Sequence, residues 1–440
     1  MQAPSAEAFR KTNVSPTRPP ERVVVTGLGV VASNANGKDA FSRALREGRT
    51  GVRPCPQLRE GGFHCQINAI PQGIDELKRR YLTEEEILGT NQGMTFAAIA
   101  AIDAWEDGGL SRLPPDSDEV HWDSGAIVGT ALAGLDAVAE KLLPLVRAGR
   151  LRRIGSTLLE QSMLSGNSAR VCGLLGLGNQ VSTACTLGND AVVQAYRHVR
   201  SGRAKRMLAG GSEGHSKYGY VVLDAMGWLC STKNDDPGRA SRPMSATASG
   251  YVPGAGAGIL LLESLSSAKE RGARIYAEVL GGHVNSGGHR MGGSMSTNSA
   301  EGLRRCIRAA LATAGIHAEQ VDAINGHLGS TLDDAREIAC WSEALGLPPS
   351  KMPLIQATKS LVGHAVGAAG GIECVTAVLE LAEGFLHGSA NCEDLHPALA
   401  AYANRIPHAA VEVPDMKVIA KTTLGLGDVN ACVIFGKFED

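Results

Sequence analysis

Short apolar runs alternate along this chain with amphipathic, Ala-rich stretches. The runs are rich in Val, Ile and Leu, which is typical of strands buried on both faces, whereas the longer stretches are typical of helices. The pattern predicts strands at residues 22–32, 125–129, 181–183, 207–213, 256–263, 275–282, 323–326, 354–357, 418–422 and 431–435. It predicts helices at residues 38–47, 83–106, 136–148, 187–201, 299–314, 331–346 and 367–383, the second starting with a capping box at Thr83.

The alternation of strands and helices predicts an α/β fold with mostly parallel sheets covered by helices on both faces. A similar set of elements occurs in residues 22–272 and again in residues 273–440, so we expect two similar halves, although their residues do not match well. Residues 1–21 are rich in Pro, Ser, Thr and Arg and lack periodicity. This composition predicts a mobile tail, with an organellar targeting peptide as the alternative.

The composition narrows the function classes. The 440 residues are enough for two large cores, and a net charge of −2 gives no field that would attract nucleic acid. No apolar run approaches the ~20 residues that span a bilayer. The ten cysteines include no C-x-x-C pair, which argues against a zinc ribbon or a thioredoxin-type site. No signal peptide precedes the fold, so we expect free thiols in a reducing cytoplasm.

Cys185 lies between a β-branched stretch, residues 181–183, and the start of a predicted helix at residue 187. A thiol on such a turn is exposed at a tight corner and faces the amides of the helix N-terminus, whose partial positive charge favours thiolate over thiol. Because thiolate is the nucleophilic form, this position predicts a nucleophile that needs no metal. One cysteine on a turn is weak evidence, and its meaning depends on histidines that complete a site.

Two histidines have surroundings comparable to those of Cys185. His327 follows the predicted strand at 323–326, and His364 follows the strand at 354–357 in a segment rich in Gly and hydroxyl residues. The ends of strands in α/β sheets are where ligands bind. Each histidine taken alone is more often structural than catalytic, but the three residues together favour a catalytic site.

Three motifs around these residues resemble those of the β-ketoacyl-acyl-carrier-protein synthases of the thiolase fold. That family shows T-A-C, then N-A-H-G-T-x-T, then K-S-x-x-G-H-x-x-G-A-A-G. The matching residues are Thr183-Ala184-Cys185, then Asn325-Gly326-His327 with Thr331, then Lys359-Ser360 with Gly363-His364 through Gly370. The likeness spans residues 22–437 and is greater to the elongating synthases II than to the initiating type, which has Asn at the second His. It implies duplicated α/β halves that form a five-layered αβαβα sandwich.

The resemblance implies a decarboxylative Claisen condensation in fatty acid synthesis or in specialised polyketide or polyene synthesis. Cys185 would hold the acyl group as a thioester. His327 and His364 would hydrogen-bond the malonyl thioester carbonyl, with one of them assisting decarboxylation. Neutral imidazoles fit this task because the enolate oxygen needs preorganised donors. The backbone amides of Cys185 and Leu426 would hold the oxyanion that forms when the enolate attacks.

The resemblance also implies supporting residues. Lys359 would pair with acidic groups and orient His364. Glu337 and Asp334 match acidic positions that follow the first His motif, and a structural ion pair is compatible with these roles for Lys359 and Glu337. No metal or cofactor is implied, because decarboxylation itself supplies the carbanion.

The chain departs from the family near the site. The gate that usually reads N-S-F-G-F-G-G-T-N is residues 422–430 here, with both Phe replaced by Leu and one Gly by Asp. We expect Thr331, Leu426 and Asp428 to bind substrate, and the smaller gate predicts a changed choice of acyl chain. A Thr expected to contact pantetheine is Gly329, and the loop after it is one residue short. Ser245, Ser249 and Ala255 occupy positions that are commonly acidic. These changes favour a specialised product over bulk fatty acids.

An acyl carrier protein that delivers acyl and malonyl thioesters is the expected partner. Carriers are acidic, so a basic rim should steer them. Arg152 and Arg153 match one expected basic pair, whereas the other expected stretch, residues 83–86, is mostly acidic, with the basic run 78–80 just upstream. The resemblance implies a homodimer, and a heterodimer with a different subunit stays open.

Two other functions stay open. A CoA-dependent thiolase shares the fold and a Cys nucleophile but uses a second Cys as base, and the matching gate loop here contains none. A catalytically silent partner subunit, such as a chain-length factor, lacks the nucleophile. Cys185 argues against that function, although the departures at the gate are what a drifting subunit would show.

Overall fold

The computed structural model describes residues 20–114, 117–132, 134–150, 177–179, 183–288 and 298–439, together with residues 155, 158 and 161. Most of the predicted tail, residues 1–21, therefore lies outside the described residues, as do Arg152 and Arg153. None of the helices within the described ranges combines the length and apolar character needed to cross a bilayer.

Ten strands form one large mixed sheet in the order β10-β9-β13-β14-β8-β1-β7-β6-β4-β5. Five come from the first part of the chain: β1 (Val23–Val31), β4 (Ser124–Gly129), β5 (Leu177–Asn179), β6 (Arg206–Glu213) and β7 (Gly256–Ser264). Five come from the second: β8 (Ala277–Ser286), β9 (Ala323–Asn325), β10 (Leu354–Gln356), β13 (Val418–Gly425) and β14 (Val429–Gly436). Two short pairs lie apart from this sheet: β2 (Arg53–Pro54) with β3 (Ile67–Asn68), and β11 (Phe385–Leu386) with β12 (Val411–Glu412).

The two sets of five strands have the same topology. In the first set, β7 pairs antiparallel with β1 and with β6, and the pairs β6–β4 and β4–β5 are parallel. In the second set, β14 pairs antiparallel with β8 and with β13, and the pairs β13–β9 and β9–β10 are parallel. The sets meet where β1 pairs with β8 through two residue pairs. The duplicated architecture is thus confirmed, but the expectation of mostly parallel sheets was wrong. Only three residues connect β13 to β14, and a connection this short forces neighbouring strands to run antiparallel.

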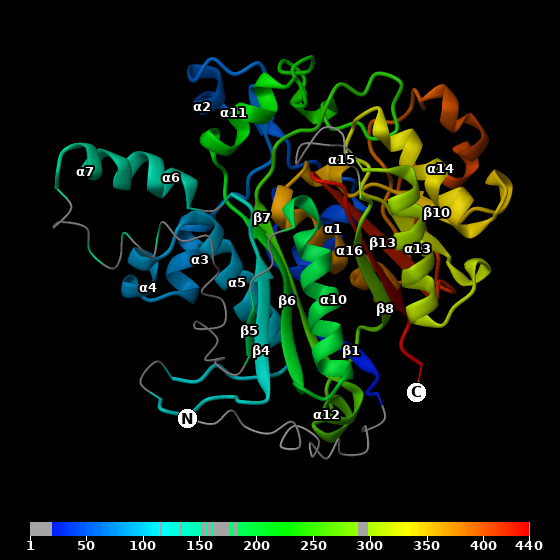
Figure 1. Cartoon of the computed structure of the whole chain (residues 1–440), viewed down its shortest axis with the longest axis horizontal. Coiled ribbons are helices and arrows are strands. Elements are labelled where there is room, and N and C mark those ends of the chain that lie inside the picture. Colours follow the sequence, from blue (N-terminus) through cyan, green and yellow to red (C-terminus); the bar gives the residue numbers. More distant parts are fainter. Residues whose placement is uncertain are drawn as a thin grey trace, which may run out of the picture.

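Helices cover the outer faces of the sheet, and two further helices lie between its two sets of strands. The central helices are α10 (Leu187–Arg200) and α16 (Ala369–Glu383), which pack against each other and against strands of both sets. The outer faces carry α5 (Gln92–Asp107) on the first set and α13 (Ala300–Ala314), with α14 (Asp333–Leu345) beside it, on the second. Figure 1 shows α5 to the left of β6 and α13 to the right of β8, with α10 between them. The result is five layers.

Glycine allows the central layers to approach closely. A Cβ on Gly188 of α10 would lie 2.3 Å from the backbone nitrogen of Gly371 in α16, so only glycine fits there. Likewise a Cβ on Gly258 of β7 would lie 2.2 Å from the carbonyl carbon of Gly371. A side chain at Gly188 would push α10 away from α16, and one at Gly258 would push β7 away from α16. Either change would displace helices whose first residues border the candidate site.

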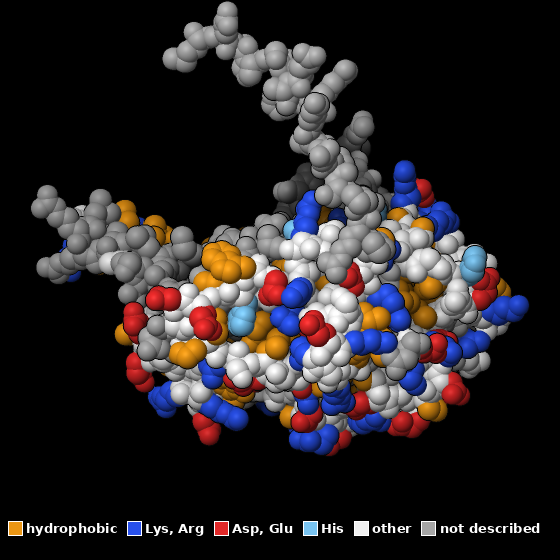
Figure 2. Space-filling view, turned by 90° about the horizontal axis from the view of Figure 1, so that it is seen from below, with side chains coloured by type: hydrophobic (Ala, Val, Ile, Leu, Met, Phe, Trp, Pro, Cys, Tyr) orange, Lys and Arg blue, Asp and Glu red, His pale blue; other side chains and the backbone are white. Residues whose placement is uncertain are grey.

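The remaining helices are shorter or peripheral. They are α1 (Lys38–Arg46), α2 (Pro56–Glu60), α3 (Ile74–Tyr81), α4 (Glu84–Gly89), α6 (Leu135–Ala137), α7 (Leu143–Arg147), α11 (Lys217–Ala225), α12 (Leu265–Glu270) and α15 (Lys359–Val362). The capping box at Thr83 is confirmed, but the single helix expected at residues 83–106 is two helices, α4 and α5. The chain breaks at Asn91, whose side chain accepts a hydrogen bond from the Met94 amide at 2.9 Å and so starts a new helix. Figure 2 shows basic and acidic side chains interspersed over one face of the molecule.

Candidate active site

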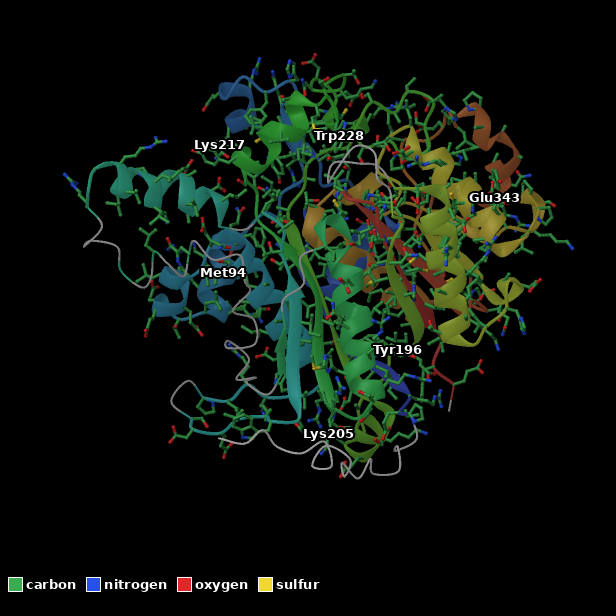
Figure 3. The ribbon with its side chains drawn as sticks, in the orientation of Figure 1. Met94, Tyr196, Lys205, Lys217, Trp228 and Glu343 are labelled. Atoms are coloured by element: carbon green, nitrogen blue, oxygen red, sulfur yellow. The ribbon has the colours of Figure 1, made fainter. Side chains whose placement is uncertain are left out.

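A cavity of about 480 Å³ brings together residues from distant parts of the chain. Five predicted site residues line it, namely Cys185, Thr331, His327, His364 and Leu426. Trp228, labelled near the top of Figure 3, also lines it and marks this end of the molecule. Cys185 is the only cysteine among the described residues that line the cavity, so a second thiol is not part of this wall.

Cys185 lies in the 3₁₀ turn Ala184–Thr186, directly before α10. Ala184 has φ of 51°, which is uncommon for a residue with a side chain and holds the turn at a sharp angle. The predicted position at a helix start is confirmed, but the expected thiolate is not. Burial raises the pKa of the Cys185 thiol to about 12, and the nearby Lys359 charge opposes this shift only in part. The resting nucleophile is therefore a thiol, because the loss of hydration outweighs the favourable charges.

His364 follows α15 and is fixed by its neighbours on two sides. Its backbone amide donates to the Val252 carbonyl at 2.8 Å, and its own carbonyl accepts from the Gly254 amide at 2.9 Å. Its ring Nδ1 accepts a hydrogen bond from the Val366 amide at 3.0 Å, so the neutral ring carries its proton on Nε2. Burial, and then the charges of Lys359 and Lys421, hold the pKa of His364 well below its usual range.

His327 follows β9, and its ring lies edge-on to that of His364, with centroids 5.1 Å apart and an interplanar angle of 80°. Burial and the Lys359 charge hold the pKa of His327 well below its usual range. The Nδ1 atom of His327 is buried without a hydrogen-bond partner among the described residues. Both imidazoles are consequently neutral at physiological pH.

Three buried charges lie behind the histidines. Glu373 of α16 pairs with Lys359 through one carboxylate oxygen and with Lys421 of β13, at 2.7 Å, through the other. Lys359 also donates to the carbonyl of His327 at 2.6 Å. The ammonium group of Lys359 therefore holds the His327 backbone, and the role of Lys359 in orienting His364 stays a prediction.

Sequence reasoning missed Glu373 and Lys421. Each is a charged residue within a buried apolar element, one in an Ala- and Gly-rich helix and the other in a strand. Charged side chains in such places are rarely left unpaired, because burial of a lone charge is costly. A charged residue inside an apolar run is thus the signal that could have revealed this ion cluster.

Glu337 and Asp334 of α14 hold the loop after His327. The Glu337 carboxylate accepts from the His327 amide at 2.8 Å and the Leu328 amide at 2.9 Å. Asp334 accepts from the amides of Gly329 and Ser330. Lys359 pairs with Glu373 rather than with Glu337, so the structural ion pair expected between them is not formed. Neither acid is among the residues that line the cavity, so both position the loop.

The gate loop borders Cys185. A Cβ on Gly425 would lie 3.0 Å from the Thr183 carbonyl oxygen and 3.4 Å from the Cys185 nitrogen, so the loop passes directly over the nucleophile. Leu426 follows and lines the cavity. Asp428 does not line it: this residue has φ of 61°, and its carboxylate accepts from the Ser299 amide at 2.7 Å, at the start of α13. The structure therefore places Asp428 in support of the gate.

Ser245 occupies a position that is commonly acidic in the resembling family, but a carboxylate is still present nearby. The Ser245 hydroxyl donates to Asp394 at 2.6 Å, and Arg242 donates to the same carboxylate at 2.8 Å. Ser249, at another such position, hydrogen-bonds to Thr232 at 2.7 Å. The local network is thus complete with different residues.

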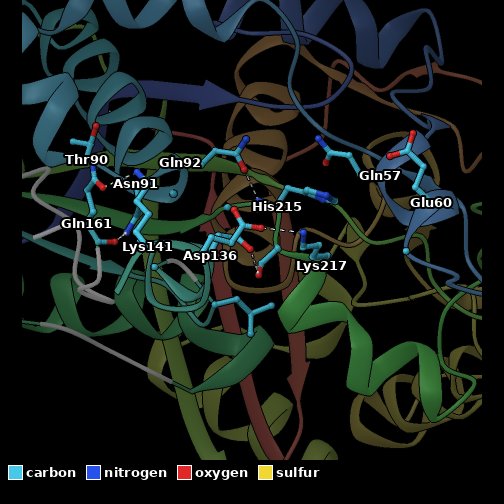
Figure 4. Close-up of a pocket in the computed structure, with 18 residues that line it drawn as sticks. Gln57, Glu60, Thr90, Asn91, Gln92, Asp136, Lys141, Gln161, His215 and Lys217 are labelled. Carbon is cyan, nitrogen blue, oxygen red and sulfur yellow. Dashed lines mark hydrogen bonds and ion pairs between the residues drawn. The ribbon is translucent and has the colours of Figure 1, made fainter. Parts of the chain in front are cut away.

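A second, larger cavity of about 670 Å³ is lined mainly by polar residues (Figure 4). Several of its charged groups already have partners. Lys217 pairs with Glu140 at 2.9 Å, and Asp136 accepts from Ser216 at 3.0 Å. Burial lowers the pKa of His215 to about 4, so that ring is neutral. No cysteine lines this cavity among the described residues. The chemistry of a nucleophile beside two imidazoles is found in the smaller cavity.

Comparisons with known proteins agree with these features. The family described as "Beta-ketoacyl synthase, N-terminal domain" matches residues 20–268, and "Beta-ketoacyl synthase, C-terminal domain" matches residues 276–393. A chloroplastic 3-oxoacyl-[acyl-carrier-protein] synthase I of Arabidopsis thaliana is 32% identical over 431 residues, which cover 96% of this chain and 88% of that protein. A 3-oxoacyl-[acyl-carrier-protein] synthase 2 of Vibrio cholerae is 31% identical, covering 94% of this chain and 98% of that protein.

Solved structures give the same result. The ishigamide ketosynthase/chain length factor superposes with a TM-score of 0.84 at 28% identity, covering 96% of this chain and 100% of that one. A second solved structure is that of a type II PKS acyl-carrier protein in complex with its ketosynthase bound to the hexaketide. It gives a TM-score of 0.83 at 30% identity, covering 95% of this chain and 100% of that one.

Proposed function

Because the chain belongs to the β-ketoacyl synthase family, we propose that it condenses an acyl group held on Cys185 with a malonyl unit delivered by an acyl carrier protein. The fold is the thiolase fold, and the activity is that of an acyltransferase. The observation that carries the proposal is the single cavity lined by one thiol and two neutral imidazoles.

The first step loads the enzyme. The Cys185 sulfur attacks the thioester carbonyl of the acyl carrier, and its proton leaves with the carrier thiol. Because burial raises the pKa of Cys185 to about 12, the thiol must lose its proton as the new bond forms. The bond from the carbonyl carbon to the carrier sulfur breaks, and an acyl-Cys185 thioester remains.

The second step makes the carbanion. A malonyl carrier loses CO₂, and the electrons of the broken carbon–carbon bond form an enolate on the thioester. The Nε2–H of His364 is fixed as a donor because Nδ1 accepts from the Val366 amide. Together with His327 it would stabilise the enolate oxygen, which is where charge develops. Neutral donors suit this task, since a cation would also hold the carboxylate that must leave.

The third step joins the chains. The enolate carbon attacks the acyl-Cys185 carbonyl, and the resulting oxyanion would accept from the amides of Cys185 and Leu426 at the gate. Collapse releases the β-ketoacyl carrier and the Cys185 thiolate, which takes a proton from solvent. Leu424 and Leu426 shape the cavity wall at this point, and their branched side chains support the proposal of a specialised acyl chain.

The partners follow from this chemistry. A carrier protein is required, and docking through Arg152 and Arg153 stays a prediction, as does a cytoplasmic location.

We further propose a homodimer. Two features support it: β5 is the last strand of the sheet, and α11 exposes the apolar side chains of Tyr218, Val221, Val222 and Met226. A strand that ends a sheet among the described residues and an exposed apolar helix face are each typical of surfaces that another chain covers. Static light scattering of the purified protein should then give twice 45.9 kDa.

The alternatives are less well supported. A thiolase needs a second cysteine as base, and Cys185 is the only one lining the cavity in the part of the chain that the structure describes. A chain-length factor needs no nucleophile, yet here the thiol, the imidazoles and the ion cluster behind them are all in place.

A condensation assay tests the proposal. The purified protein is incubated with malonyl carrier and a panel of acyl carriers, and the carrier-bound products are identified by mass spectrometry. We expect β-ketoacyl carriers longer by two carbons, with one CO₂ released for each. Preferential loading of ordinary saturated long chains would contradict a specialised product. Absence of product with every chain would contradict the proposed activity and favour the silent subunit.

A further inference from the structure

Tyr251 lines the Cys185 cavity in direct contact with a proposed catalytic histidine. Its ring centroid lies 4.9 Å from that of His364, with an interplanar angle of 53°. The following residue, Val252, accepts the hydrogen bond from the His364 amide. Tyr251 and His364 are therefore held as one unit, so the phenol belongs to the part of the cavity wall where the proposed condensation takes place.

The backbone of Tyr251 is fixed by hydrogen bonds on both sides. Its amide donates to the Trp228 carbonyl at 3.1 Å, and its carbonyl accepts from the Cys230 amide at 3.0 Å. The side chain is half-buried and packs at the edge of an apolar cluster that includes Leu229 and Val252. The position of the phenol is thus set before any substrate enters.

The hydroxyl of Tyr251 has no hydrogen-bond partner within the ranges that the structure describes. Tyr220, in the same apolar cluster, is the opposite case, since its hydroxyl donates to the Gly254 carbonyl at 2.9 Å. The Ser249 hydroxyl, which also lines the cavity, is already bonded to Thr232. Since no group within the described ranges pairs with the Tyr251 hydroxyl, an occupant of the cavity can do so.

The neighbouring cavity wall is largely apolar, with Ala248, Trp228, Leu424 and Leu426 among its residues. A saturated acyl chain that displaces water from this wall would leave the phenol unpaired, which weakens its binding. A chain with an oxygen near the thioester would pair with it instead. Sites built to hydrogen-bond a substrate oxygen discriminate against the analogue that lacks it.

We propose that Tyr251 is a specificity-determining residue, whose hydroxyl donates a hydrogen bond to an oxygen on the β-carbon of the acyl chain. The preferred substrates are then 3-oxoacyl or 3-hydroxyacyl carriers rather than saturated ones of the same length. This inference rests on the proposed condensation. Because that reaction itself leaves an oxygen on the β-carbon, the enzyme that supplies the substrate would be a condensing enzyme or a ketoreductase, without full reduction between rounds.

The test compares carriers of equal chain length, butyryl with acetoacetyl and octanoyl with 3-oxooctanoyl. For each we would measure kcat/KM with malonyl carrier and the amount of acyl-Cys185 by intact-protein mass spectrometry. The wild-type enzyme should prefer the oxygenated chain by about tenfold. Tyr251→Phe should reduce this ratio to near one, because the oxygenated chain loses its partner and the saturated chain no longer leaves a hydroxyl unpaired. Tyr220→Phe, which removes a hydroxyl already paired with protein, is the matched control and should leave the ratio unchanged.

Three results would overturn the inference. One is a wild-type ratio near one, which needs no variant and so does not depend on how a variant folds. Another is an unchanged ratio in Tyr251→Phe with neither chain slowed. The third is an equal loss for both chains in Tyr251→Phe, which would assign the hydroxyl to the malonyl unit. Failure of the condensation itself would be seen separately, as absence of product from the wild-type enzyme with all four carriers.

Discussion

The two central helices begin in the same way but carry different chemistry. The 3₁₀ turn Ala184–Thr186 precedes α10, and the 3₁₀ turn Val366–Ala368 precedes α16. Each contains one residue with a positive φ, 51° at Ala184 and 43° at Val366. The first turn presents the thiol of Cys185, whereas the second fixes the imidazole of His364 through the Val366 amide. A duplicated fold has thus used one backbone device for a nucleophile and for a hydrogen-bond donor.

The two turns show how charge is distributed in and around the site. Burial raises the pKa of the Cys185 thiol and lowers that of the His364 imidazole, so both groups are neutral at rest. The fixed charges lie one layer further back, in the cluster of Glu373, Lys359 and Lys421. The Cys185 and His364 side chains therefore bring no charge to the cavity, and charge develops there only on the reacting substrate. Preorganised donors have most effect on a charge that develops in the transition state.

Removal of the first turn's chemistry should give the largest effect. Cys185→Ala should lower the condensation rate by about 1,000-fold or more, because no acyl-enzyme forms. Decarboxylation of malonyl carrier should continue, since His364 and His327 are untouched. Product and CO₂ would be measured in the same reaction. Cys340→Ala, which changes a buried thiol in α14 away from the cavity wall, should retain both activities.

Removal of the second turn's chemistry should give the reverse pattern. His364→Ala should lower decarboxylation by about 100- to 1,000-fold, the range expected for loss of one oxyanion donor. Acyl loading of Cys185 should persist, and intact-protein mass spectrometry after incubation with acyl carrier would detect it. If loading fell as steeply as decarboxylation, the division of tasks between the two turns would be wrong.

The charge cluster should matter more for stability than an exposed pair does. Glu373→Gln leaves Lys359 and Lys421 buried without a counter-charge, and we expect a loss of about 3–5 kcal/mol in the free energy of unfolding. Urea denaturation followed by circular dichroism measures it. The control Glu343→Gln removes an exposed carboxylate paired with Arg304, and should cost at most ~1 kcal/mol.

The pH dependence should show that the imidazoles work in the neutral form. Because the pKa values of His327 and His364 lie well below 6.5, the rate should fall only when the pH drops well below 6.5. Unfolded histidines begin to bind protons near pH 6.5, where the buried ones do not, so stability should begin to fall at a higher pH than the rate does. In Lys359→Met, loss of the nearby charge should move the acid limb of the pH–rate profile to higher pH. An acid limb above 6.5 in the wild-type enzyme would contradict neutral donors.

The smallest effect is expected from the strained backbone. Ala184→Gly removes the penalty for a side chain at positive φ, about 1–2 kcal/mol, but adds the entropy of glycine in the unfolded chain, about 0.5–1 kcal/mol. The net change in unfolding free energy should be a stabilisation of at most ~1.5 kcal/mol, measured by thermal denaturation. A clear destabilisation would show that Ala184 contributes packing that its backbone angle does not reveal.

Local sequence patterns predicted the helices and strands well, but they predicted contacts between distant residues poorly. Residues 187–201 were expected to be helical and α10 spans Leu187–Arg200, because apolar periodicity is a property of the segment itself. The partner of Lys359 and the place of Asp428 depend on contacts between distant segments, which no local pattern records. Tyr251 was missed for the same reason, since only the fold brings it against His364. The division of the chain between residues 272 and 273 stays a prediction.

The most direct test of the central claim follows one acyl group through the site. The wild-type enzyme is incubated with acyl carrier, its mass is measured, and the labelled peptide is identified before and after addition of malonyl carrier. We predict one acyl adduct, on the peptide that contains Cys185, which disappears as β-ketoacyl carrier forms. An adduct on another residue, or one on Cys185 that malonyl carrier does not discharge, would contradict the account.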